Sequence, residues 1–428
     1  MTAQHGVASA AATIDRSVLP GVVLLGGAHN ALALARSFGR KGVPVVLVSN
    51  DHPLPTYSRY IGRSFDWPGA AAPGAAAWLA AFGEQHDLQK WLLLPCADNE
   101  VKLVAENHDL LLGRFQIIGK PWDDLQHLCN KQLLIEAAET AGISVPRSYP
   151  VESAADAAQI DVTFPVILKP AMRMSRNALT SAKAWRADTR DELVALYRKA
   201  AALQGQDGVV VQDYIPGGGE AQFSYAALWS NNAPLAEMAA RRTRQYPVEF
   251  GYTSTFVEIV DNEEIKAMSR KLLSSNGFEG LVEVEYKHDA RTGSYKILDV
   301  NPRAWSWLAL CDAGGLDFAA LIGGILSAHP ETASQAALGH AWVHASRDIA
   351  ASMHLMLLNR LPLGRWFTSY RQNLTFAVFA WDDPKPALLE LPATLARVAK
   401  RALAANGQAI KARFVRARAH RRTGIHLL

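Results

Sequence analysis

The sequence predicts a mixed protein of the α/β and α+β classes. Short apolar segments alternate with helical periodicity over the first 120 residues, as in a parallel sheet covered by helices. Residues 280–303 instead have the pattern of two antiparallel strands joined by a tight turn at residues 289–293, which is typical of an α+β domain. From about Trp342 the periodicity is helical, so we expect a mainly helical C-terminal extension.

Length and composition are those of an ordinary globular protein. The chain has 428 residues, enough for two or three domains, with 49% hydrophobic and 20% charged residues. Its three cysteines, Cys96, Cys129 and Cys311, are odd in number and lack metal-type spacing, which favours a reducing, cytoplasmic setting. We expect neither a secretion signal at the start of the chain nor a membrane-spanning helix.

The positive charge is concentrated at the C-terminal end. The segment from Arg397 to Leu428 holds nine Lys and Arg residues and no acid, so a total of +4 less nine leaves −5 for the rest of the chain. A basic tail of this kind does not predict a nucleic-acid partner for the whole protein. Residues Arg397–Arg422 read as one amphipathic helix, and peripheral contact of that helix with an anionic membrane surface stays open.

The first apolar segments form a β-α-β unit. A strand at Val22–Leu25 is followed by Gly26-Gly27, a helix over 31–40 and a strand over 43–48. The two glycines are not the three-glycine dinucleotide fingerprint, so we predict no nucleotide at this turn. We interpret His29 as a polar residue at a helix start, and Asp98 as the cap of a helix over 100–107.

The next segments carry two lysines, of which Lys169 is placed to meet an anion. A single helix over 122–141 would carry Lys131 in its interior, and the apolar strand Phe164–Pro170 ends on Lys169. A lysine that closes a buried strand is costly to desolvate unless an anion neutralises it, so phosphate is a natural partner. Another buried strand, Val209–Ile215, ends at a glycine-rich turn.

The predicted hairpin at 280–303 carries acids on one face. Because side chains alternate along a strand, Glu283 and Glu285 share a face of the first strand. The second strand would place Asp299 and Asn301 on one face together with Ile297 and Arg303, and Leu298 and Val300 on the other. Clustered carboxylate and amide oxygens suit Mg²⁺, whereas a solvated polar face is the alternative that the hairpin alone leaves open.

The order of these parts is more specific than any one of them. Lys131 is followed by LKP at 168–170, QDYIPGGGE at 212–220, EVEYK at 283–287 and LDVNPR at 298–303. Over about residues 15–330 this order resembles the ATP-grasp superfamily. Within it, the chain is most similar to the carboxylate–amine ligase branch of D-aspartate ligase-like and predicted ATP-grasp carboligase proteins.

The resemblance implies an ATP-grasp fold with four parts. A Rossmann-like pre-ATP-grasp domain would cover 14–121, and the first ATP-grasp subdomain 122–207. The second subdomain, with the metal site, would cover 208–330, and a helical extension with a basic tail 331–428. ATP would lie between the two subdomains.

The resemblance also implies roles for individual residues. Lys131 and Lys169 would contact the ATP phosphates, and Glu220 would hold the ribose. The residues lying against adenine would be Gln212, Asp213, Tyr214 and Ile215. The residues holding two Mg²⁺ ions, with Mn²⁺ as a substitute, would be Glu285, Asp299 and Asn301. Arg303 would face the transferred phosphate and acyl group, with Lys169 as its catalytic partner.

A basic segment and two departures from the family pattern complete the prediction. Arg241, Arg242 and Arg244 follow a buried strand and could grip the triphosphate and a substrate carboxylate, with Arg244 as the candidate catalytic group; a solvated basic turn is the alternative. Asp299 replaces the glutamate usual in the family. The loop over 170–176 lacks the usual glycines, and Arg173 and Arg176 could supply charge there instead.

The implied reaction joins a small-molecule carboxylate to an amine, using ATP and passing through an acyl phosphate. Two alternatives remain at this point. One is a non-catalytic ATP-binding protein, suggested by Asp299 and the glycine-poor loop. The other is a membrane-associated scaffold, suggested by the basic C-terminal helix.

Overall fold

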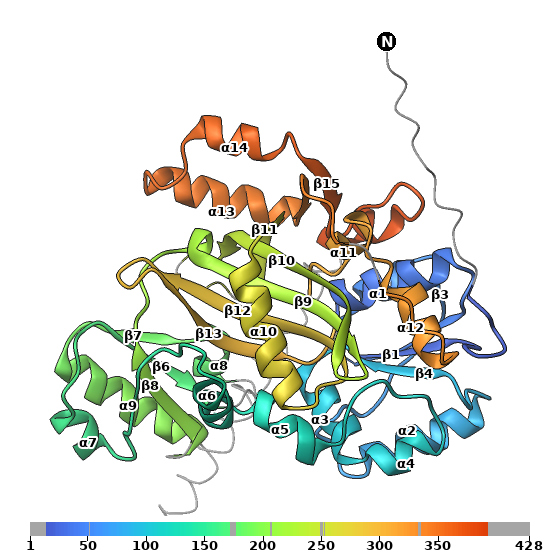
Figure 1. The fold of residues 1–428 in the computed structure, drawn as a ribbon, viewed down its shortest axis with the longest axis horizontal. Helices are drawn as coiled ribbons and strands as arrows, with labels where there is room; N and C mark the ends of the chain where they lie inside the picture. The colour runs from blue at the N-terminus through green and yellow to red at the C-terminus, as the bar shows by residue number, and fades with distance from the viewer. Residues whose placement is uncertain are drawn as a thin grey trace, which may run out of the picture.

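The chain folds around three sheets. The computed structural model describes residues 14–50, 52–171, 177–205, 208–248, 251, 253–332 and 335–392. The loop arginines Arg173 and Arg176 and the basic tail from Arg397 lie outside these residues. Figure 1 shows the first sheet at one end of the molecule, the large sheet in the middle and the small sheet at the other end. Both helices and sheets are present throughout, as the predicted class requires.

The first sheet is parallel, with strand order β3-β2-β1-β4. Its strands are β1 (Val22–Leu25), β2 (Val45–Val48), β3 (Ile61–Phe65) and β4 (Leu92–Pro95), and its helices are α1 (His29–Arg40), α2 (Ala75–Gln85), α3 (Asp98–Glu106) and α4 (His108–Leu112). Gly26 and Gly27, with φ of 71° and 88°, turn the chain from β1 into α1. A Cβ on Gly27 would lie 2.5 Å from that of Cys96, so this turn requires glycine.

The expected single helix over 122–141 is two helices. Helix α5 (Trp122–Cys129) ends at Asn130, whose backbone is extended and whose side chain accepts a hydrogen bond from the backbone N–H of Gln132. Helix α6 (Lys131–Thr140) therefore begins at Lys131, which occupies the first helical position rather than the interior. Helical periodicity continues across both segments, which hides a break that one asparagine cap produces.

The small sheet has strand order β5-β8-β6-β7 with antiparallel pairing. Its strands are β5 (Ser148–Tyr149), β6 (Val166–Pro170), β7 (Trp185–Ala187) and β8 (Val209–Asp213), and its helices are α7 (Ala154–Gln159), α8 (Ala178–Ala182) and α9 (Arg190–Gln204). Buried residues of this sheet and of α7–α9 form a core of their own. The small sheet is thus a separately packed unit.

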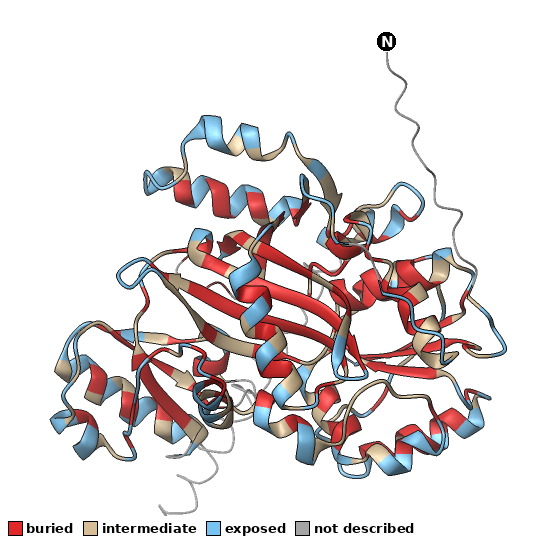
Figure 2. Ribbon diagram, viewed as in Figure 1, coloured by how far each residue is buried: buried red, intermediate tan, exposed pale blue. Residues whose placement is uncertain are grey.

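The large sheet has strand order β13-β12-β9-β10-β11-β14-β15. Its strands are β9 (Gln222–Ser230), β10 (Ala233–Tyr246), β11 (Thr253–Val260), β12 (Gly280–Asp289), β13 (Ser294–Asn301), β14 (His340–Val343) and β15 (Asn373–Phe376). All neighbours pair antiparallel except β14 and β15. Its strands are largely buried, as Figure 2 shows.

The two faces of the large sheet pack against different parts of the chain. One face is covered by α10 (Glu263–Ser275), α5 and α6, with Tyr286 and Leu272 in the shared core. The other face packs on α11 (Ala309–Ala313), α12 (Phe318–Leu326) and α1, around Trp305 and Trp307. The first domain and the large sheet therefore share one continuous core.

The C-terminal extension adds strands as well as helices. Strands β14 and β15 extend the large sheet, while α13 (Ala345–Leu357) lies against β10 and β11 and is followed by α14 (Leu363–Ser369) (Figure 1). Short strands of four residues give too little alternation to be recognised against a helical background. Leu357, Phe367 and Trp381 are exposed, so packing of this region on the core is only partial. No helix among the described residues is long and apolar enough to cross a membrane.

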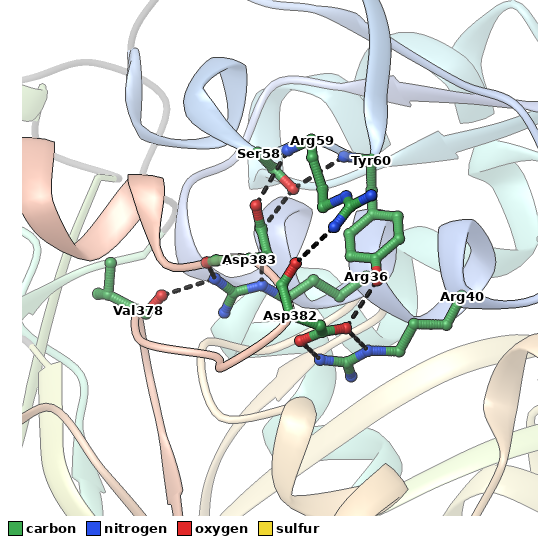
Figure 3. Close-up of polar contacts among 8 residues, drawn as sticks. All are labelled: Arg36, Arg40, Ser58, Arg59, Tyr60, Val378, Asp382 and Asp383. Carbon is green, nitrogen blue, oxygen red and sulfur yellow. Dashed lines mark hydrogen bonds and ion pairs between the residues drawn. The ribbon is translucent and has the colours of Figure 1, made fainter.

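Two neighbouring aspartates, Asp382 and Asp383, connect the extension to the first domain through hydrogen bonds and ion pairs (Figure 3). The buried Asp383 accepts hydrogen bonds from Arg36 Nε at 3.0 Å, Ser58 Oγ at 2.6 Å and the backbone N–H of Arg59 at 2.9 Å. Arg36 also donates to the carbonyl of Val378 at 2.7 Å. Arg36 and Asp383 are 347 residues apart in sequence, so no local pattern predicts this buried ion pair.

Asp382 makes the outer half of the same contact. Its carboxylate accepts two hydrogen bonds from Arg40, at 2.8 and 2.9 Å, and one from Tyr60 Oη at 2.6 Å. These hydrogen bonds, led by that from Arg40, hold the pKa of Asp382 below its usual value. Its side chain is 41% exposed, against 1% for Asp383, so solvent weakens this pair.

The two aspartates make a matched pair for measuring what burial adds. We expect Asp383→Asn to lower the free energy of unfolding by about 2 kcal/mol, because a buried arginine loses its charged acceptor. Asp382→Asn should cost less than about 1 kcal/mol, as exposed pairs do. Urea denaturation followed by tryptophan fluorescence measures both, and equal costs for the two variants would contradict the assignment of Asp383 as the buried anchor.

Candidate active site

The centre of the site is the hairpin of β12 and β13. Glu283 lies directly opposite Asn301, and Glu285 directly opposite Asp299. A register shift follows Glu285, where Leu298 is the extra residue on β13. Because of this bulge Ile297 packs in the core with Val300 instead of sharing a face with Asp299, contrary to the strict alternation expected from the sequence.

The carboxylates of Glu285 and Asp299 are in contact with cationic side chains. Asp299 Oδ1 lies 3.2 Å from Lys131 Nζ. Glu285 Oε2 lies 3.2 Å from Lys183 Nζ and 2.8 Å from Arg242 Nη1. Opposed acids in the middle of a sheet are thus stabilised by positive charge, and the polar face of the hairpin is a buried electrostatic cluster rather than a solvated surface.

Glu283 has a different environment, although it lies on the same face. It accepts hydrogen bonds from Ser224 Oγ at 2.9 Å, from Trp307 Nε1 at 3.1 Å and from Asn301 Nδ2 at 3.4 Å. Burial and the charge of Glu285 raise its pKa. Its oxygens are occupied by neutral donors, so Glu283 orients Asn301 while Glu285 is the acid that faces the cations.

Lys169 lies near the end of β6, opposite this cluster, and most of the charged side chains that act on it are positive. Burial and the charge of Lys131 lower its pKa to about 7, with Lys183 and Lys287 acting in the same direction and Asp299 opposing them. Positive charges gathered around a buried lysine in this way form a site suited to a polyanion.

A pocket beside Lys169 lies between the small and large sheets. The residues that line it include Ile167, Lys169 and Lys183 from one side, Leu298 and Lys287 from the other, and Asp213, Tyr214 and Ile215 along the connecting strand. The Tyr214 ring contacts two cations, with the guanidinium of Arg186 4.8 Å and the ammonium of Lys287 5.4 Å from its centroid. The pocket has an apolar body and charged ends, which fits a nucleotide.

Two of the residues expected around a nucleotide are placed differently. Gln212 is buried and donates from Nε2 to Ser148 Oγ at 2.9 Å, and it is not among the residues that line the pocket. Glu220 lies in the turn after β8, exposed, and accepts a hydrogen bond from the backbone N–H of Gly218 at 2.8 Å. Asp213, held by Tyr149 Oη at 2.5 Å, is the polar side chain that reaches the pocket.

Arg303 connects the hairpin with the first domain. Its Nη2 donates to Asn301 Oδ1 at 3.2 Å, and its Nε donates to Asp98 Oδ1 at 2.5 Å. Burial lowers the pKa of Arg303, but the charge of Asp98 outweighs that effect and keeps the pKa above its usual value. Asp98 makes no side-chain cap of α3, so the capping role expected from the sequence is replaced by this ion pair.

A second pocket adjoins the carboxylates on the side of the first domain. The residues that line it include Asp98, Lys102, Trp122, Cys129, Lys131, Asp299 and Asn301. Lys102 lies 5.3 Å from the centroid of the Trp122 ring. Acidic and basic groups therefore meet in one cavity next to the hairpin.

Arg244 does not join this cluster. Its Nε and Nη2 donate to both oxygens of the buried Asp348, at 2.8 and 2.9 Å, and its Nη1 donates to Ser369. The register shifts in β10 between Arg241 and Gln245 change which side chains face the hairpin. Arg242 is consequently the arginine of this segment that reaches Glu285, and Arg244 is committed to a structural ion pair.

Sequence reasoning missed two cations of the site, Lys287 and Lys183, and did not single out a third, Arg242. Lys287 carries a usable signal, since it continues the alternation of Glu283 and Glu285. Lys183 gives no such signal, because it follows the short helix α8 and its φ is +70°. Arg242 was one of three candidate arginines, and nothing in the local sequence shows the bulge that selects it.

A sequence comparison identifies a relative. D-aspartate ligase of Enterococcus faecium (strain Aus0004) is 23% identical over 316 residues, which cover 70% of this chain and 75% of that protein. No protein-family model matches the chain.

Solved structures with this fold include three enzymes. The biotin carboxylase domain of Hydrogenobacter thermophilus 2-oxoglutarate carboxylase, in complex with MgADP, ADP and bicarbonate, gives a TM-score of 0.57 at 14% identity, covering 74% of this chain and 73% of that one. L-amino acid ligase from Bacillus licheniformis gives a TM-score of 0.54 at 16% identity, covering 72% of this chain and 74% of that one. Phosphoribosylglycinamide synthetase from Anaerococcus prevotii gives a TM-score of 0.52 at 14% identity, covering 72% of this chain and 75% of that one.

These similarities agree with the order of motifs and with the three-sheet architecture. The predicted fold class is confirmed: a parallel sheet precedes a small antiparallel sheet and a large, mostly antiparallel sheet, and the last two enclose a pocket. The chain is thus similar in sequence to a D-aspartate ligase, and it shares its fold with the L-amino acid ligase and the biotin carboxylase domain.

Proposed function

We propose that this protein joins a small-molecule carboxylate to an amine, using ATP and forming an acyl phosphate, with release of ADP and phosphate. The observation that carries the proposal is the meeting of two opposite charge groups between the small and large sheets. Lys169 and Lys183 come from the side of the small sheet, and Glu285, Asp299 and Asn301 from the large sheet. A nucleoside triphosphate with a divalent cation complements both groups, because the phosphates match the lysines and the cation matches the carboxylates.

The residues of the hairpin fit Mg²⁺. Two carboxylates directly opposite one another, with an amide oxygen beside them, offer the hard oxygen donors that this ion prefers. In our proposal Glu285, Asp299 and Asn301 hold it, and Mn²⁺ can substitute. The ion would supply neutralisation of phosphate charge as the phosphoryl group is transferred.

The lysines and Arg303 would position the reacting groups. Lys131, Lys169 and Lys183 would hold the phosphates, with the adenine between Leu298 and the backbone of residues 213–215. Glu220, in the turn after β8, remains the candidate for the ribose hydroxyls. Arg303 would bind the oxygens of the transferred phosphoryl and acyl groups, and Arg242, rather than Arg244, would complete the cationic wall.

The chemistry balances as two displacements. An oxygen of the substrate carboxylate attacks the γ-phosphorus, and the bond to ADP breaks. The amine nitrogen then attacks the acyl carbon, the carbon–oxygen bond breaks, and that oxygen leaves as part of phosphate. The pocket lined by Asp98, Lys102 and Trp122 adjoins the hairpin and is our candidate for the organic substrates.

The test of the reaction follows the carboxylate oxygen. Pairs of amino acids and other acids are screened with ATP for ADP formation that requires both partners, and the active acid is then labelled with ¹⁸O. Transfer of label into phosphate supports an acyl phosphate. Formation of AMP, or unlabelled phosphate, would contradict it, and ATP binding without turnover under any pair would favour a non-catalytic ATP-binding protein.

The low pKa of Lys169 predicts proton uptake on nucleotide binding. With a pKa of about 7, most Lys169 is neutral at pH 8, and ATP phosphates would raise that pKa and protonate it. We expect uptake of about one proton per MgATP at pH 8, and weaker ATP binding as the pH rises above 7.

Calorimetric titrations in buffers of different ionisation enthalpy measure this proton. Lys169→Arg is the matched control, because arginine stays charged and should bind ATP without uptake. The same group affects stability in the opposite sense. Its folded-state pKa lies below the unfolded value of 10.5, so the cost of burying its charge is full below pH 7 and disappears as the pH approaches 10.5. Equal proton uptake in both proteins would show that another group titrates.

A further inference from the structure

A second cluster of metal-type side chains lies where the C-terminal extension meets the first domain. His29 begins α1, His344 follows β14 and precedes α13, and Glu390 lies in the helical residues 385–392. The two histidines are buried, at 7% and 1% exposure, and Glu390 is half-buried. Among the described residues these three form the group of histidine, cysteine or acidic side chains whose ligand atoms converge.

The distances between the donor atoms match a small coordination sphere. His344 Nε2 lies 3.1 Å from His29 Nε2 and 3.1 Å from Glu390 Oε1, and the third side of the triangle is 3.8 Å. In tetrahedral zinc sites, bonds of about 2.0–2.1 Å place the donor atoms about 3.3 Å apart. The three atoms are therefore spaced as ligands of one ion would be.

Hydrogen bonding alone does not account for this arrangement. Nε2 of His344 carries either one hydrogen or one lone pair, yet it has two partners at 3.1 Å. A single ion would engage a lone pair from each of the three atoms. The two imidazoles and the carboxylate are all ligand types that Zn²⁺ accepts.

The packing around the cluster holds its members in place. Arg36 and Arg40 follow His29 by seven and eleven residues. Both separations are close to whole numbers of helical turns, so the three side chains share one face of α1. Asp383 and Asp382 contact the two arginines, and Glu390, seven residues beyond Asp383, reaches His29 (Figure 3 shows the aspartate end). Ser346 Oγ lies 3.4 Å from the other ring nitrogen of His344, where it can help orient the ring.

We propose that His29, His344 and Glu390 form a binding site for Zn²⁺ that joins the first domain, the edge of the large sheet and the C-terminal helix. Two histidines and one carboxylate leave the fourth position for a water molecule. The charge of Arg347 also acts on this group and opposes a second cation, so affinity comes from the three direct bonds. The site is distinct from the Mg²⁺ residues on β12 and β13, and its argument is independent of the proposed reaction.

The experiment uses untagged full-length protein, because a histidine tag would bind the same ions. The protein is stripped with a chelator, dialysed into buffer with excess Mg²⁺ and titrated with Zn²⁺ or with Co²⁺ as a spectroscopic probe. We expect one Zn²⁺ per chain by elemental analysis, visible absorption bands of low-symmetry Co²⁺, and a higher Tm with Zn²⁺. Absence of bound Zn²⁺ in the wild-type protein overturns the proposal.

Variants assign the ion to these residues. His29→Ala and His344→Ala should abolish binding, and Glu390→Gln, which preserves shape, should weaken it at least about tenfold. His354→Ala is the matched control. His354 is an exposed histidine on α13, the helix that follows His344, and this variant should bind Zn²⁺ normally. Glu285→Gln should also bind normally, which separates this site from the active site. If an alanine variant does not fold, Glu390→Gln decides, and unchanged Zn²⁺ affinity in that variant refutes the assignment.

Discussion

Glu285→Gln is expected to lower kcat by about 10³-fold or more while the protein stays folded. The substitution keeps the size of the side chain but removes the charge that faces Lys183 and Arg242 and that would hold Mg²⁺. Loss of one group that stabilises a developing charge costs about 10²–10³ in kcat, and loss of a metal ligand adds to that. Steady-state ADP formation with a saturating substrate pair measures the change.

The control for this variant is Asp289→Asn. Asp289 lies on the same strand and is also buried, but it pairs with Arg291 at the hairpin turn, outside the charged cluster. We expect its kcat to stay within a few-fold of wild type. If both variants retain activity, the hairpin is not the metal site, and the proposed mechanism fails with it.

Asp348→Ala is expected to lower the free energy of unfolding by about 3–5 kcal/mol. Asp348 is fully buried, and it accepts hydrogen bonds from Arg244, from Thr255 Oγ1 at 2.8 Å and from Tyr370 Oη at 2.9 Å. Its removal leaves the Arg244 guanidinium, itself 2% exposed, without a counter-charge, and breaking one partner of a buried pair costs about this much.

The measurement separates a structural role for Arg244 from a catalytic one. Unfolding in urea gives the stability, and kcat is measured well below the unfolding transition. The double variant Asp348→Asn with Arg244→Gln should recover part of the loss, because it removes the uncompensated charge. A kcat that falls about 10²-fold or more in folded Arg244→Gln would instead restore Arg244 to the catalytic group.

Much of the fold follows from the sequence because local patterns were strong and agreed with one another. The β-α-β unit, the apolar strand that ends on Lys169 and the alternating hairpin each predict their own structure. Alternation along each strand also predicts that Glu283 and Glu285 share a face, but the direct pairing of Glu285 with Asp299 depends on the bulge at Leu298. The order of the motifs then indicated the resemblance to ATP-grasp proteins, which no single motif indicates alone.

The remaining features depend on contacts that no local pattern encodes. A bulge changes the face of Ile297, register shifts exchange Arg242 for Arg244, and one asparagine cap divides a helix at Lys131. Asp98, Lys183 and His29 acquire their partners from segments distant in sequence. Such pairings are decided by tertiary packing, so a single sequence leaves them open.

The shared core and the C-terminal fastening also determine how the molecule can move. We expect the first domain and the large sheet to move as one block, because they share a core and are joined again by the contacts of α1 with Asp382 and Asp383. The small sheet has its own core and connects to that block through the chain near residues 145 and 215. We therefore expect any closure around a nucleotide to be a rotation of the small sheet alone, with those two connections as the hinge.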